Sequence, residues 1–129
     1  MVNFLWVCLG SAVGGGARYL LSAWTLKALG AGFPYGTFAV NLIGSFLLAA
    51  IMSIGVETTT LSSTLRITLA TGVMGGFTTY STFSYETLKY LQEGAWGVAM
   101  VNVLVTVFGC LLAGLLGWLS ARGLVGVAA

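Results

Sequence analysis

The sequence predicts an all-α membrane protein with four transmembrane helices, and three observations support this prediction. Of the 129 residues, 58% are hydrophobic and 6% are charged, whereas about a quarter of the residues in a soluble domain carry charge. The mean hydropathy is +1.01. The chain also divides into four apolar stretches, each close to the roughly 20 residues that cross a bilayer as a helix. We therefore expect one membrane domain over residues 1–129.

The expected helices cover residues 4–26, 36–54, 65–88 and 96–119. Gly30 and Pro34 favour a turn after the first helix, since Pro lacks a backbone N–H and Gly tolerates unusual dihedral angles. A Thr/Ser cluster at residues 58–63 marks the second loop, and Gly94 marks the third. Within the third helix, the pair Gly75 and Gly76 precedes a run of hydroxyl residues. We expect a break there, near residues 75–79.

Catalysis is not expected from this composition. The chain contains no His and no Asp, and its three acids are Glu57, Glu86 and Glu93. General acid–base and metal-dependent reactions would lack most of their usual groups. Cys8 and Cys110 lie far apart in apolar stretches, without the spacing of metal ligands, and we interpret them as small buried thiols. The expected partner is membrane lipid, and no nucleic acid is expected.

The loop charges do not favour one orientation in the membrane. With four crossings, Arg66 and Arg122 lie on one side, and Lys27 and Lys89 lie on the other. The positive-inside rule acts through an imbalance of Lys and Arg between the two sides. Two interpretations remain open: another signal sets the topology, or both orientations are made and used.

Small residues recur along two of the expected helices. Gly10, Gly14 and Ala17 share a face of the first helix, and Gly109 and Gly117 share one on the fourth. Small residues let helices approach closely in lipid. Packing within one chain explains each glycine taken singly. Together they favour a homodimer, which would be antiparallel if both orientations are inserted.

Polar residues also recur at helical spacing. Thr37, Asn41 and Ser45 share one face of the second helix, and Thr106 follows Asn102 by four residues on the fourth. Hydrogen bonds between helices, or to a carbonyl of the same helix, are one explanation. Hydroxyl and amide donors and the positive rims of aromatic rings would also suit an anion. Carbonyls freed at the break would instead suit a cation such as Na⁺, so these residues alone do not choose the ion.

Residues 75–84 read Gly-Gly-Phe-Thr-Thr-Tyr-Ser-Thr-Phe-Ser. This segment, with Gly36-Thr37, Val40-Asn41 and Gly44-Ser45-Phe46 before it, resembles the Fluc (CrcB) family of fluoride channels. The pattern of Gly14 and Arg18-Tyr19 also fits. The similarity covers essentially the whole chain, and the motif at residues 75–84 is very specific.

The resemblance implies a dual-topology antiparallel homodimer in the bacterial inner membrane, with two fluoride pores and a structural Na⁺ at its centre. Gly75 and Thr78 would contribute backbone carbonyls to Na⁺. The residues that would line the fluoride pore are Asn41, Tyr80, Phe83, Ser81, Thr82, Thr37 and Thr106. Where the family usually has Phe, this chain has Tyr80, which keeps the ring and adds a hydroxyl.

Two charged residues lie within the expected helices. Arg18 would attract anions to a pore entrance, or it would extend to the membrane surface or pair with a carboxylate. Glu86 would pair with Lys89 three residues later, or it would form the wall of an aqueous vestibule.

Three classes of function are compared. A passive fluoride channel is the leading hypothesis, and the main alternative is a small dual-topology multidrug exporter. Proton-coupled exporters of that kind need a membrane-embedded carboxylate in the first helix, which this chain lacks. A non-transporting assembly subunit would leave the aligned hydroxyls unexplained.

Overall fold

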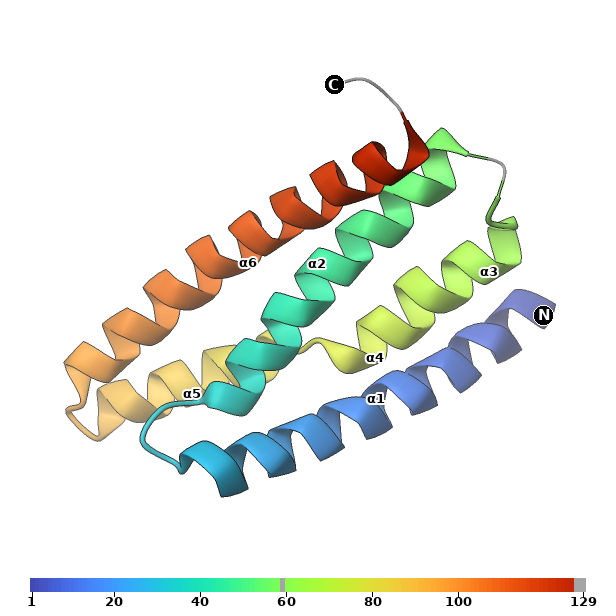
Figure 1. The fold of residues 1–129 in the computed structure, drawn as a ribbon. Coiled ribbons are helices and arrows are strands. Elements are labelled where there is room, and N and C mark those ends of the chain that lie inside the picture. The colour runs from blue at the N-terminus through green and yellow to red at the C-terminus, as the bar shows by residue number, and fades with distance from the viewer. Residues whose placement is uncertain (59, 127–129) are drawn as a thin grey trace.

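The computed structural model describes residues 1–58 and 60–126, and all regular elements in that part of the chain are helices. The elements are α1 (Val2–Leu29), α2 (Tyr35–Glu57), α3 (Ser63–Ile67), η1 (Thr68–Met74), α4 (Gly75–Phe77), α5 (Tyr80–Gln92) and α6 (Trp96–Val125). Of these, η1 is a π-helix, which the sequence analysis does not predict. The helices α2 and α6 lie side by side, and α1 runs along α3 and α4 (Figure 1).

Within the described residues, three helices are long and apolar enough to cross a membrane, namely Val2–Leu29, Tyr35–Val56 and Trp96–Val125. The sequence also predicts a crossing at residues 65–88. The structure divides that region among α3, η1, α4 and α5, none of which alone reaches the length required. The difference arises because the π-helical turn and the break interrupt the regular helix.

The break lies later than the paired glycines. Gly75 has helical dihedral angles, with φ −62° and ψ −37°. The extended residues are Thr78, with φ −84° and ψ 160°, and Thr79, with φ −154° and ψ 106°. The Thr79 side chain then caps α5 by accepting a hydrogen bond from the backbone N–H of Thr82, as Thr commonly does at a helix N-terminus. Hydroxyl residues therefore form the break.

The glycines pack helices of one chain together. A Cβ at Gly76 would lie 2.5 Å from the backbone oxygen of Ser11, and one at Gly10 would lie 2.8 Å from that of Thr68. On the other side of the molecule, a Cβ at Gly117 would collide with the backbone oxygen of Phe46. Packing within the chain thus explains these close approaches, and they do not by themselves indicate a second copy.

Many large apolar side chains are exposed, including Phe4, Leu20, Phe108 and Leu111, each more than 60% exposed. The largest fully buried side chains are Val40 and Asn102. A surface of this kind is suited to lipid or to protein, because it would aggregate in water.

Candidate functional site

A cavity of about 440 Å³ opens between α2, the break and α6. Its lining includes Asn41, Ser45, Thr78, Tyr80, Phe83, Thr106 and Cys110. No charged residue lines it within the described part of the chain. The structure therefore brings four of the seven predicted pore residues, Asn41, Tyr80, Phe83 and Thr106, to one uncharged cavity.

Asn41, on α2, forms hydrogen bonds to the backbone of the break. Its Nδ2 donates to the carbonyl of Thr79 at 3.0 Å, and its Oδ1 accepts from the N–H of Thr79 at 2.8 Å. These bonds satisfy an extended residue that is nearly buried, with 8% of its surface exposed. Because an amide nitrogen has two hydrogens, one donor of Asn41 is left to serve the cavity.

Two aromatic rings stand at the same cavity. The centroids of Tyr80 and Phe83 are 5.7 Å apart, with the ring planes tilted by 53°. Phe83 is buried, whereas Tyr80 is 80% exposed at the start of α5. One ring therefore belongs to the interior of the chain, and the other projects from its surface.

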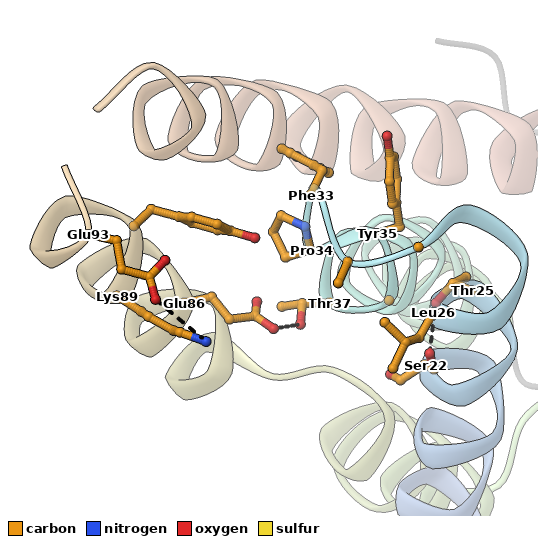
Figure 2. Close-up of a pocket in the computed structure, with 14 residues that line it drawn as sticks. Ser22, Thr25, Leu26, Phe33, Pro34, Tyr35, Thr37, Glu86, Lys89 and Glu93 are labelled. Atoms are coloured by element: carbon orange, nitrogen blue, oxygen red, sulfur yellow. Dashed lines mark hydrogen bonds and ion pairs between the residues drawn. The ribbon is translucent and has the colours of Figure 1, made fainter. Parts of the chain in front are cut away.

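A second cavity, of about 340 Å³, lies beside the C-terminal half of α5 (Figure 2). Within it, Thr37 Oγ1 donates to Glu86 Oε1 at 2.9 Å. Lys89 Nζ lies 3.9 Å from Glu93 Oε1. Of the two interpretations of Glu86, the structure therefore does not show the ion pair with Lys89: the Lys89 ammonium lies nearest to Glu93, one turn further on, and Glu86 turns toward α2.

The two cavities follow one another along the groove between α2 and α5. Thr37 lines the second cavity and Asn41 the first, and four residues correspond to about one helical turn. On the facing helix, Glu86 lines the second cavity and Phe83 the first. Thr37, which the sequence groups with the pore residues, thus lies one turn from the uncharged cavity, beside a carboxylate.

On α6, a hydrogen-bonded chain links Asn102 to its neighbours. Asn102 Nδ2 donates to Thr87 Oγ1 at 2.9 Å, and Thr106 Oγ1 donates to Asn102 Oδ1 at 3.3 Å. Asn102 is 1% exposed. Interhelical bonding, one of the two explanations considered for this amide, accounts for it.

Ser81 and Thr82 lie apart from both cavities, on an exposed face of α5. Thr79 Oγ1 donates to Thr82 Oγ1 at 2.9 Å and lies 3.4 Å from Ser81 Oγ. Within one chain, these hydroxyls contact Thr79, the N-cap residue of α5. Because they lie outside both cavities, an ion could contact them only where a second molecule covers this face.

Cys110 lines the uncharged cavity, and Cys8 is exposed. The interpretation of both as buried packing thiols is therefore wrong for Cys8. For Cys110, the helical spacing from Asn102 through Thr106 predicts a place on the polar face of α6, and the structure shows it half-buried at the cavity.

The carbonyls predicted to bind Na⁺ have the right chemistry for a hard cation. Thr79 N–H, which would continue α4 by bonding to the Gly75 carbonyl, donates to Asn41 instead. Gly75 is exposed, and a Cβ there would meet nothing within 4 Å. The Thr78 carbonyl, however, accepts a hydrogen bond from Arg18 Nη1 at 3.4 Å. The carbonyl oxygens of Gly75 and Thr78 are therefore suitable ligands for Na⁺, but the positive charge of Arg18 beside Thr78 disfavours a cation there. No group of three or more His, Cys, Asp or Glu side chains that could hold a metal occurs among the described residues.

Comparisons with known proteins show the family of this chain. Residues 5–118 match the family model described as CrcB-like protein, Camphor Resistance (CrcB). The chain is 52% identical over 125 residues to a protein of Sorangium cellulosum named fluoride-specific ion channel FluC, covering 97% of this chain and 98% of the relative. Proteins of the same name from Anaeromyxobacter sp. strain K and Geobacter metallireducens are 52% and 46% identical, covering 98% and 96% of this chain and all of each relative. The chain therefore belongs to the CrcB family.

Proposed function

We propose that this protein is a passive, fluoride-selective channel that lets fluoride leave the cell down its electrochemical gradient and so confers fluoride resistance. The observation that carries the proposal is the uncharged cavity, where Asn41, Thr106 and the rings of Tyr80 and Phe83 meet. The remaining amide hydrogen of Asn41 and the ring edges can replace water around a small anion, and Thr106 could donate to it if its hydroxyl released Asn102 Oδ1. The absence of a basic residue from its described lining suits conduction, because a permeant ion must also leave. The names of the relatives support fluoride as the ion.

The path that we propose runs along the groove between α2 and α5. An anion would pass from the cavity beside Glu86 and Lys89 to the one beside Asn41 and Phe83. In this scheme Glu86 forms a vestibule wall, and its bond to Thr37 keeps one carboxylate oxygen occupied.

The channel that we propose is an antiparallel homodimer of two oppositely inserted copies, each crossing the bacterial inner membrane four times. In support, Tyr80 is 80% exposed, and Ser81 and Thr82 are exposed beside it. Hydroxyls facing lipid find no hydrogen-bond partner, so a second copy would cover this polar face better than acyl chains. The even split of Lys and Arg between the two sides is consistent with insertion both ways.

We further propose that Na⁺ binds to the carbonyls of Gly75 and Thr78 from both copies. A bound cation would supply positive charge that holds four carbonyl oxygens together at the interface. Asn41 contributes indirectly, because its bond to the Thr79 N–H leaves the Gly75 carbonyl without its helical donor.

Fluoride efflux from liposomes tests the proposal. Vesicles loaded with potassium fluoride and given a potassium ionophore should release fluoride to an electrode within seconds once purified protein is incorporated. Protein-free vesicles give the background. Release that requires a proton gradient would favour the exporter class, and release at the background rate would rule out both kinds of transport.

A further inference from the structure

Arg18 of α1 bonds to a backbone carbonyl at the helix break. Its Nη1 donates to Thr78 O at 3.4 Å, across 60 residues of sequence. Arg18 belongs to α1, one of the three helices suited to cross the membrane, and it is half-buried. Ionisable side chains at such positions are costly and usually have a specific role.

The two residues of the break are held by side chains from two different helices. Asn41 of α2 bonds to the backbone of Thr79, and Arg18 of α1 bonds to that of Thr78. Thr78 follows the last residue of α4, where carbonyls lack their helical donors and attract positive charge. Among the described residues, the ion pair found joins Lys89 to Glu93. The hydrogen bond of Arg18 is therefore with a neutral oxygen.

The contact is weak. A donor–acceptor distance of 3.4 Å exceeds the usual range for an N–H···O bond. A long, flexible side chain held by one such bond can be displaced by a ligand that binds the oxygen more strongly. A carbonyl oxygen has two lone pairs, so geometry alone does not exclude two partners, but two positive charges on one oxygen repel each other at short range.

We propose that Arg18 and Na⁺ compete for the carbonyl of Thr78, so that Arg18 sets the sodium concentration at which the break becomes occupied. This inference rests on the sodium site proposed above. Without Na⁺, the guanidinium stabilises the break in its place. With Na⁺ bound, Arg18 turns away from Thr78.

A sodium titration of stability tests the competition without using channel activity. The apparent melting temperature of the purified protein is followed by tryptophan fluorescence as Na⁺ replaces N-methylglucamine at constant ionic strength. Arg18→Gln is expected to lower the half-saturating Na⁺ concentration by about tenfold or more, because a unit charge a few ångströms away is removed. Arg66→Gln is the matched control, since Arg66 Nη1 also donates to a carbonyl, that of Gly55 at 3.0 Å, away from the break.

The outcomes are distinct. A half-saturating concentration in Arg18→Gln equal to or above that of the wild type overturns the inference, as does an equal decrease in Arg66→Gln. If Arg18→Gln does not fold, Arg18→Lys replaces it: the shorter side chain moves the charge away, so a decrease supports the competition and an unchanged value overturns it. If neither the wild type nor the variants respond to Na⁺, the competition and the sodium site both fail, while fluoride efflux still judges the channel separately.

Discussion

Asn41 and Thr79 are joined by two hydrogen bonds, of 3.0 Å and 2.8 Å, that use both ends of the Asn41 side-chain amide. The bonds connect α2 to the point where the chain leaves its helical path, between α4 and α5. They satisfy a buried backbone that has no helical partner, and Asn41 also lines the uncharged cavity. One side chain thus stabilises the break and contributes to the candidate site.

Replacing Asn41 should destabilise the protein and stop conduction. In Asn41→Leu, the N–H and carbonyl of Thr79 lose their partners, which costs about 2 kcal/mol or more of unfolding free energy for a buried pair. Thermal unfolding in detergent and fluoride efflux measure the two effects. Asn3→Leu is the control, because Asn3 bonds to Thr64 at an exposed site. An Asn41→Leu protein that melts and conducts like the wild type would refute this role.

Gly76 should tolerate no side chain. A Cβ in Gly76→Ala would lie 2.5 Å from Ser11 O, forcing α1 and α4 apart at a cost of about 1–3 kcal/mol. Gly16→Ala on α1 is the matched control, because its Cβ would meet nothing within 4 Å. The melting temperature of Gly76→Ala should therefore be lower than that of Gly16→Ala. Equal melting temperatures would show that α1 and α4 can move apart without loss of stability.

Removing the Tyr80 hydroxyl should leave selectivity unchanged. Tyr80→Phe keeps the ring beside Phe83 and the positive ring edge, so fluoride should remain favoured over chloride. Throughput should change, because the hydroxyl that can bind the ion or narrow the path is lost. Efflux of each halide is measured in parallel. Chloride permeation through Tyr80→Phe would show that the hydroxyl itself confers selectivity.

The Cys110 thiol should be reachable from the conduction path. It lines the uncharged cavity with Asn41 and Thr106, so a small water-soluble mercurial that binds there should block fluoride efflux. Cys110→Ser should conduct and resist the block, whereas Cys8→Ser should remain sensitive. Persistent block in Cys110→Ser would place the reactive site elsewhere.

Much of the fold follows from the positions of apolar and turn-forming residues. The structure places turns beside Gly30 and Gly94, both with positive φ, near the boundaries that the sequence predicts. The third predicted helix is harder to predict from the sequence, because the position of its break depends on contacts between helices that the pattern of apolar residues does not show. Gly75 and Gly76 suggested the break, but Gly76 packs against α1, and the break falls at Thr78 and Thr79.

For the candidate site, the resemblance to the Fluc family named Asn41, Tyr80, Phe83 and Thr106 as pore residues, and the structure places these four around one cavity. Helical spacing could not reveal that the Asn41 side chain makes two hydrogen bonds to the backbone of Thr79. Nor could it reveal that Glu86 bonds to Thr37. These contacts join residues 38 to 49 positions apart, and they depend on how the helices pack. The contact of each predicted pore residue with fluoride stays a prediction.

The central claim is that neutral donors in an uncharged cavity select fluoride over larger halides. The most direct test is the reversal potential of the purified channel in a planar bilayer, with a tenfold fluoride gradient and chloride added to equalise the total anion concentration. We predict a reversal potential of about 59 mV in magnitude, the value for a monovalent ion that alone carries the current. A reversal potential near zero would mean that chloride passes as readily as fluoride, and it would contradict the account.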